Sequence, residues 1–177
     1  RTGQFVLLAA RNGDFAQYIY LLSENKVVAH PVRIGEKREL AKSGVGQVLL
    51  SSMSDGNVKR LYHRINAYSK VSGKVDVAEL LTRLYGIRER GYVFSKNRVV
   101  DGYGQVAFPV PQRDNVRPLA IGVGGSSEVI ERLEGDIVRI VQEEMGRHLK
   151  KIERPAHTAI YQATVPSPAS TVGLASA

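Results

Sequence analysis

The apolar positions along the chain change from an alternating spacing to a helical spacing and back again. Two apolar runs, 5–10 and 15–22, flank Asn12 and Gly13, and Asn-Gly between two such runs is the strongest short-range signal for a β-hairpin. A further strand is predicted over 26–32. The N-terminal part therefore predicts three strands, of which the first two form an antiparallel hairpin.

A helical spacing follows these strands. A short apolar face lies within 45–49, and a second helix begins after Ser54, whose side chain is suited to cap it. Asp76 caps a third helix, and Gly91 is suited to end it in the left-handed conformation. The middle of the chain thus predicts three helices. The apolar faces of the second and third are Val58, Leu61, Tyr62 and Ile65, and Val77, Leu80, Leu81 and Leu84.

Strands return before one long final helix. Alternation predicts strands over 92–95, 104–110 and 117–124. The last helix carries an apolar stripe from 130 to 152 and ends before Pro155. This order, with hairpin links between strands, predicts an α+β fold: an antiparallel sheet of about six strands flanked by helices, with a long C-terminal helix.

The strands over 104–110 and 117–124 have two unlike faces if they pair through a turn at 112–115. Glycine weakens a strand, so its use favours close approach of another group, either a helix or a ligand. We favour a ligand in the resulting hollow. The bulky face holds Val106, Phe108, Leu119, Ile121 and Val123, and the small face holds Gln105, Ala107, Ala120, Gly122 and Gly124.

The end of the chain differs in composition from the rest. Residues 155–177 contain no Asp, Glu, Lys or Arg and are rich in Ala, Ser, Thr and Pro, which predicts a flexible tail after a domain over 1–154. No apolar stretch reaches the roughly 20 residues of a membrane span. Because the first residue is Arg1 rather than Met, we expect the chain to be a piece of a longer protein.

Composition bounds the class of protein. At 177 residues and 43% hydrophobic content, one globular domain is expected. The formal charge of +8 comes from clusters at 33–42, 59–74 and 88–98, which lack any nucleic-acid-binding motif and are interpreted as solvated surface. The absence of Cys excludes disulfides, thiolate zinc sites and a Cys nucleophile, and it fits a cytoplasmic location.

No catalytic or metal-binding pattern is present. The four His residues show no ligand spacing, and neither a nucleophile elbow nor a Walker loop occurs, so we predict no catalytic residue, no metal and no cofactor. The segment Gly122 to Ser127 follows a strand and opens a helix as a dinucleotide fingerprint would. However, Ser127 replaces the third glycine and no strand follows the helix. An enzyme with a phosphate cradle at this segment remains an alternative.

Three stretches resemble a known family. "RERGYVFSKNRVVDGYGQVAFPV" (88–110) is similar to the characteristic stretch of the effector-binding domain of IclR-type bacterial transcriptional regulators. "AKSGVGQVLL" (41–50) resembles the segment before that domain's first helix, and "LAIGVGG" (119–125) its last strand. The resemblance covers most of 2–152. It implies a GAF-like fold that binds a small metabolite and signals to an N-terminal winged helix-turn-helix, which this chain lacks together with its linker helix.

The resemblance also implies effector contacts. Where the family commonly has Asp this chain has Ser95, and Arg98 lies near a family Glu. The loss of that Asp and the nearby Arg98 predict a less anionic site, and glycines in place of two family serines predict a roomier one. These changes predict an aromatic or other bulky carboxylic acid held by Arg98, since Arg can bind a carboxylate through two hydrogen bonds. The implied contacts, with Arg98 added, are Ser43, Gly44, Ser95, Arg98, Gln105, Gly122 and Gly124.

If Arg98 points to water, Ser43, Ser95 and Gln105 are expected to orient a neutral ligand instead. The function predicted overall is the effector-binding and oligomerisation domain of a bacterial transcriptional regulator, not an enzyme. It would form a homodimer or homotetramer, contact no membrane and contact DNA only through the missing N-terminal domain. A nucleotide-sensing GAF module is the alternative within the same fold, and the sequence upstream of Arg1 would distinguish the two.

Overall fold

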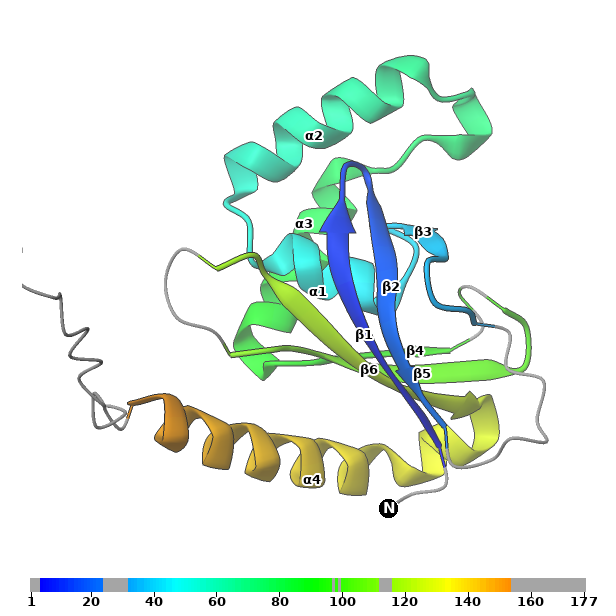
Figure 1. Ribbon diagram of the computed structural model, residues 1–177. Coiled ribbons are helices and arrows are strands. Elements are labelled where there is room, and N and C mark those ends of the chain that lie inside the picture. Colours follow the sequence, from blue (N-terminus) through cyan, green and yellow to red (C-terminus); the bar gives the residue numbers. More distant parts are fainter. Residues whose placement is uncertain (1–3, 24–31, 97, 99, 112–115, 154–177) are drawn as a thin grey trace, which may run out of the picture.

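The computed structural model describes residues 4–23, 32–96, 98, 100–111 and 116–153. Figure 1 shows a curved sheet with helices on both of its faces. The elements follow the predicted order of three strands, three helices, three strands and one helix, with a short 3-10 turn before the third helix. They are β1 (Phe5–Asn12), β2 (Phe15–Leu22), β3 (Lys37–Glu39), α1 (Gly44–Ser51), α2 (Asp55–Tyr68), η1 (Val71–Gly73), α3 (Val77–Arg90), β4 (Val93–Lys96), β5 (Tyr103–Pro109), β6 (Leu119–Ser126) and α4 (Ser127–Glu153).

The six strands form one sheet in the order β3-β2-β1-β6-β5-β4, and the five neighbouring pairs are antiparallel. The predicted hairpin of β1 and β2 and the predicted pairing of β5 with β6 are both present. At the centre of the sheet, β1 pairs with β6, with Leu7 opposite Gly122. The first and last strands of the domain therefore lie side by side. The predicted α+β antiparallel fold is confirmed.

The two faces of the sheet build two separate cores. On one face, Leu7 and Ala107 pack in a cluster with side chains of α1, α2 and α3. On the other face, Val106 and Phe108 of β5 pack with Ile130 and Ile137 of α4, which lies across that side of the sheet in Figure 1. The predicted division of β5 and β6 into a bulky face and a small face is therefore confirmed, and the bulky face packs against α4.

The predicted helix ends are also present. Ser54 caps α2, with its Oγ accepting a hydrogen bond from Asn57 N at 3.4 Å. Asp76 caps α3 in the same way, accepting from Glu79 N at 3.0 Å. Gly91 ends α3 with a φ of 77°, in the left-handed region that glycine adopts at little cost. These ends follow from local chemistry and need no tertiary contact.

The third strand differs from its predicted position. Residues 37–39 pair with β2, next to a turn in which Gly35 N donates to Tyr18 O at 2.7 Å. Of the predicted strand at 26–32, only Val32 is described, and it lies outside any strand. The partner of β2 is thus the polar segment Lys37–Glu39, whose short length gives no apolar alternation to detect. The remainder of that predicted strand, the turn at 112–115 and the tail at 155–177 lie outside the described residues.

The start of the 88–110 stretch has a structural role. Arg88 donates to the backbone carbonyls of Ser51 and Met53, at 2.9 and 2.8 Å, and to the Asp55 carboxylate at 2.8 Å. The guanidinium therefore joins α3 to the link between α1 and α2. Tyr92 packs at the other face of the sheet, with its ring centroid 5.9 Å from that of Phe108. Arg88 thus holds the end of α1 in place.

Candidate functional site

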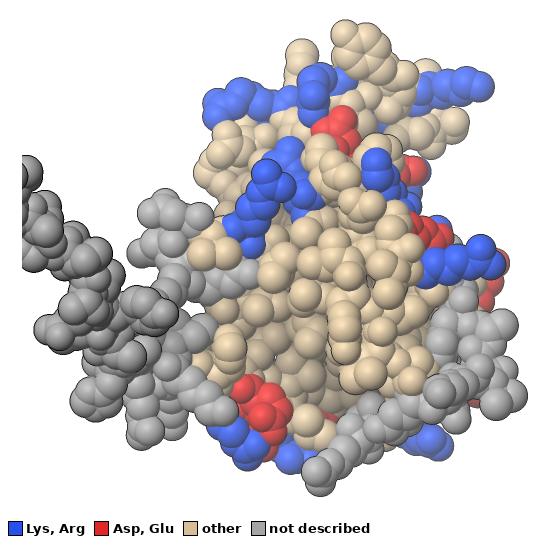
Figure 2. Space-filling model, in the orientation of Figure 1, with Lys and Arg blue, Asp and Glu red and all other residues tan. Residues whose placement is uncertain are grey.

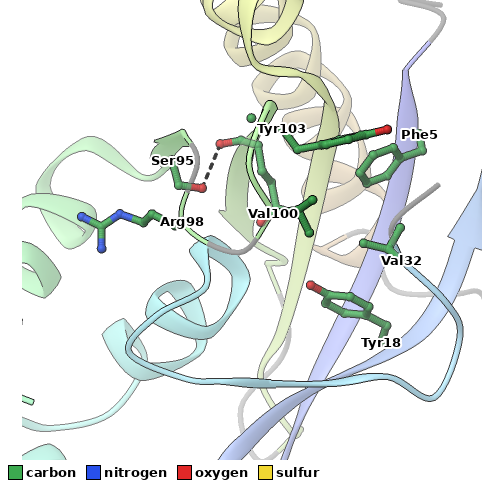
Figure 3. Close-up of a pocket in the computed structure, with 9 residues that line it drawn as sticks. Phe5, Tyr18, Val32, Ser95, Arg98, Val100 and Tyr103 are labelled. Carbon is green, nitrogen blue, oxygen red and sulfur yellow. Dashed lines mark hydrogen bonds between the residues drawn. The ribbon is translucent and has the colours of Figure 1, made fainter. Parts of the chain in front are cut away.

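A cavity of about 40 Å³ lies on the face of the sheet that α1 covers, and Figure 3 shows its lining. This volume has room for only a few water molecules. It is far smaller than a typical ligand site of about 300–1,000 Å³. A bound metabolite would therefore have to displace side chains of the lining. The lining residues are Phe5, Tyr18, Val32, Ser95, Arg98, Val100, Tyr103, Gly104 and Gln105.

One wall of this cavity is aromatic. Phe5 begins β1, Tyr103 begins β5 and Tyr18 lies in the middle of β2, and their rings face the cavity together with Val32 in Figure 3. Burial raises the pKa of the Tyr18 phenol above 10, although Arg38 beside it acts in the opposite direction. The phenol is therefore a neutral hydroxyl at physiological pH. This wall offers flat apolar surface with one hydroxyl that can donate or accept a hydrogen bond.

The polar side of the cavity comes from the paired strands β4 and β5. Ser95 and Gln105 lie opposite each other in the sheet, and Ser95 Oγ donates to the Gln105 carbonyl at 3.4 Å, drawn as a dashed line in Figure 3. The Gln105 carboxamide extends between the sheet and α1. A Cβ at Gly122 would lie 2.6 Å from Gln105 Nε2, and a Cβ at Gly44 would lie 3.0 Å from Gln105 Oε1. Glycine at both positions leaves the space that this amide occupies.

The small face of β5 and β6 is filled in this structure. Val45 of α1 approaches Gly122, with its Cγ1 3.1 Å from where a Cβ would lie. The Phe5 ring covers Gly124, with Cζ 2.5 Å from the corresponding Cβ position. The hollow that we expected a ligand to fill is thus occupied by Gln105, Val45 and Phe5. The glycines allow α1 and these side chains to approach the strands closely, which is the second explanation that the sequence pattern allowed.

The structure brings six of the seven predicted site residues together at this cavity: Arg98 at its rim and five residues on the sheet and α1. Ser95 and Gln105 line the cavity, Gly44 and Gly122 contact the Gln105 amide, and Gly124 lies beneath the Phe5 ring that forms part of the cavity wall. All five occupy the same face of the sheet or the start of α1. Their use by an effector remains a prediction.

Ser43 lies apart from this cavity. It caps α1, with its Oγ accepting from Gly46 N at 3.1 Å and donating to Glu39 O at 3.2 Å. The hydroxyl is buried and committed to these two bonds. It lines a separate groove of about 320 Å³ with Lys37, Arg38, Lys42, Glu39, Phe15 and Arg98. Ser43 therefore positions the start of α1, the helix that packs on this face of the sheet.

Arg98 lies at the rim. Its side chain is exposed, and its guanidinium points away from the aromatic wall in Figure 3. The residue borders both the small cavity and the groove of about 320 Å³. Arg98 is thus placed to meet a charged group at the cavity mouth, and it does not reach the aromatic interior in this conformation.

Six lining residues were not predicted from the sequence: Phe5, Tyr18, Val32, Val100, Tyr103 and Gly104. On a strand, an aromatic residue that lines a cavity has the same alternation as one in a core. The available signal was the pairing of Phe5 with Gly124, because an aromatic ring readily covers a cross-strand glycine. That signal requires the register of β1 against β6, which joins strands at opposite ends of the chain.

The phosphate cradle considered at 122–127 is not open to a ligand. Gly122 and Gly124 are covered as described above, and a Cβ at Gly125 would lie 1.7 Å from Gln4 Oε1. The backbone N–H of Ser127 donates to Gly102 O at 2.8 Å rather than pointing into a free site. Across the described part of the chain, no group of three or more His, Cys, Asp and Glu could hold a metal ion. No helix among those residues is long and apolar enough to span a membrane.

These features define the class of domain: a GAF-like α+β fold with a small cavity on the face of the sheet that packs against α1. The family model described as bacterial transcriptional regulator IclR C-terminal matches residues 1–151, and the chain belongs to this family. It is therefore a domain of transcriptional regulators and not of enzymes. The family resemblance of the three stretches is confirmed.

Solved structures agree. The effector domain of the transcriptional regulator IclR from Acinetobacter sp. ADP1 is 25% identical, with a TM-score of 0.71 over 85% of this chain and 87% of that one. An IclR family regulator from Brucella abortus is 21% identical (TM-score 0.69), with 85% of this chain and 57% of that one covered. The repressor BlcR from Agrobacterium tumefaciens is 20% identical (TM-score 0.62), with 82% of this chain and 59% of that one covered. This chain thus spans little more than half of the latter two. No curated protein matches it.

Proposed function

We propose that this domain senses a small metabolite in the cavity beside Gln105 and thereby controls DNA binding by a winged helix-turn-helix in the same protein. The observation that carries the proposal is the convergence of Ser95 and Gln105 on an aromatic-walled cavity. A concave apolar wall with a few directed polar groups is the usual make-up of a small-molecule site. The family resemblance selects the same two residues independently of this geometry.

The effector class that fits best is an aromatic or similar carboxylic acid. Phe5, Tyr18 and Tyr103 offer flat surface to an apolar body. Arg98 borders the cavity, and three further cations, Lys37, Arg38 and Lys42, line the adjoining groove, where Glu39 is the sole carboxylate in the described lining. A carboxylate at the mouth would therefore meet a positive field while its ring enters the cavity.

A thermal-shift panel tests this proposal. The panel contains benzoate, phenylacetate and longer aromatic acids, each beside its neutral amide, with cyclic nucleotides as representatives of the nucleotide-sensing alternative. We expect the acids to raise Tm in a concentration-dependent way, since a ligand that binds only the folded state stabilises it by mass action. Stabilisation by nucleotides alone, or by amides as strongly as by acids, would contradict the assigned effector class.

DNA binding by this chain alone is expected to be weak. The charge of +8 supplies only the nonspecific, salt-sensitive part of DNA affinity. We expect Kd for duplex DNA to weaken by at least about 10-fold between 50 and 200 mM salt, with no preference between sequences. Fluorescence anisotropy with two unrelated duplexes measures this. Sequence-specific binding at physiological salt would show that residues 1–177 read DNA themselves.

We also propose that the regulator assembles as a homodimer or homotetramer. Winged-helix regulators read palindromic half-sites through two-fold pairing, so the effector domain has to tolerate or supply a contact between copies.

A further inference from the structure

Arg98 lies where three hollows meet. It lines the aromatic cavity, the groove of about 320 Å³ beside β3, and a further hollow of about 250 Å³ beside the start of α3. We call the second of these the β3 groove and the third the α3 hollow. The two share only Lys42 and Arg98 among their described lining residues. The α3 hollow has no part in the function proposed above.

The α3 hollow has cationic side chains to spare. Asp76 Oδ1 accepts the capping hydrogen bond from Glu79 N at 3.0 Å, and the Glu79 carboxylate pairs with Arg83. Within the described part of the chain, neither Lys74 nor Arg98 forms an ion pair. An anion that enters this hollow would meet both cations. The charged residues of the lining are Lys42, Lys74, Arg83 and Arg98, with Asp76 and Glu79 as the carboxylates.

The β3 groove has a similar excess of positive charge. Lys37 also forms no ion pair among the described residues. Lys42 pairs with Glu39 at 2.9 Å, but both side chains are more than half exposed, and such a pair is held weakly enough to accept another anion. Figure 2 shows Lys and Arg beside Asp and Glu where Figure 1 places β3, whereas the surface over β1 and β2 is largely free of charge.

A single carboxylate cannot satisfy both hollows. If it binds in the β3 groove near Lys37, Lys74 of the α3 hollow keeps no anionic partner, and the reverse holds for binding near Lys74. Two carboxylates on a short chain would serve both, with Arg98 between them because it borders each hollow. The aromatic cavity takes an apolar group, so the ring has to be a third branch of the same molecule.

We propose that the effector is an arylalkyl dicarboxylic acid. Its ring enters the aromatic cavity, one carboxylate binds near Lys37 in the β3 groove, and the second binds near Lys74 in the α3 hollow. This inference rests on the effector site proposed above and adds a second acidic group to its ligand. It gives the α3 hollow, which lies outside the cavity, a role in recognising the effector.

Three related acids separate the ring from the two carboxylates. Benzylsuccinate has both, 4-phenylbutyrate is the same skeleton without one carboxylate, and succinate lacks the benzyl group. Isothermal titration at constant ionic strength measures the Kd of each. We expect benzylsuccinate to bind at least about 10-fold tighter than 4-phenylbutyrate, because it forms a second charge-assisted contact. Succinate is expected to bind at least about 10-fold more weakly than benzylsuccinate, because it leaves the aromatic cavity empty.

Lys74→Gln locates the second carboxylate. The side chain is exposed, so the change should leave the fold intact. We expect benzylsuccinate to bind at least about 5-fold more weakly to this variant, since one charge–charge contact is lost. The Kd of 4-phenylbutyrate should change by less than about 2-fold, because its single carboxylate can use the β3 groove. Lys70→Gln is the matched control, an exposed lysine nearby in the sequence that lines neither hollow.

The possible failures point to different conclusions. Equal affinities for benzylsuccinate and 4-phenylbutyrate would overturn the dicarboxylate inference and leave sensing of a monocarboxylic effector intact. Benzylsuccinate binding that Lys74→Gln does not weaken, or succinate binding as tight as that of benzylsuccinate, would overturn the inference too, since the α3 hollow or the ring would then play no part. Failure of both aromatic acids to bind would contradict the proposed effector class itself.

Discussion

Gly46→Ala is expected to destabilise the domain by at least about 3 kcal/mol, the largest effect that we predict for a single methyl group. Gly46 lies in the first turn of α1 and is buried. Its added Cβ would lie 2.3 Å from Leu40 O, 2.6 Å from Leu40 Cα and 2.6 Å from Ser43 Oγ. Because two of these atoms are backbone, rotation of a side chain cannot relieve the overlap, and α1 would have to move away from the chain that leads into it.

Thermal unfolding measures this effect. A loss of about 3 kcal/mol corresponds to a fall in Tm of roughly 6–12 °C for a domain of this size. The matched control is Gly135→Ala on α4, where no atom lies within 4 Å of the added Cβ. That change is expected to stabilise the helix by about 1 kcal/mol. Equal effects of the two substitutions would mean that α1 does not approach its preceding segment as closely as described.

The parts of the fold that the sequence predicts are those determined by local chemistry. Ser54, Asp76 and Gly91 act within one turn of their own backbone, so their roles do not depend on the rest of the chain. The division of β5 into two faces likewise follows from alternation alone. By contrast, β3 is a polar strand of three residues whose only reason to be a strand is its hydrogen bonding to β2. No pattern within such a segment can indicate it.

The candidate site shows the same division. The small face of β5 and β6 was predictable, but the groups that fill it come from distant segments: Val45 from α1 and Phe5 from β1. The alternation of large and small residues identifies a face on which another group must pack. It does not indicate whether that group is a ligand or a helix. Ser43 illustrates a second limit, since a serine before a helix can be a ligand contact or an N-cap, and here its hydroxyl caps α1. Only the paired strands β4 and β5 bring two predicted polar residues, Ser95 and Gln105, onto the cavity.

The second large effect is expected at the mouth of the cavity. Arg98→Ala should weaken the binding of an aromatic acid by about 10–100-fold and leave its neutral amide unchanged, since a charge-assisted contact contributes about 1.5–3 kcal/mol. The exposed guanidinium can turn toward the cavity without disturbing the core. Arg98→Lys keeps the charge but not the planar pair of donors, so it is expected to give an intermediate loss. Arg60→Ala on α2 is the matched control away from the cavity.

A filling substitution separates the location of the site from its charge. Gly122→Leu is unsuited, because its side chain would collide with Val45 and the Gln105 amide and disturb the core. Val100→Phe instead enlarges a half-buried lining residue outside the regular elements, whose side chain points into the cavity in Figure 3. We expect it to abolish the thermal-shift response to acids and amides alike while the Tm without ligand stays within a few degrees. An acid that binds Val100→Phe normally but loses affinity in Arg98→Ala would place the effector in the basic groove beside Lys42 rather than in the aromatic cavity.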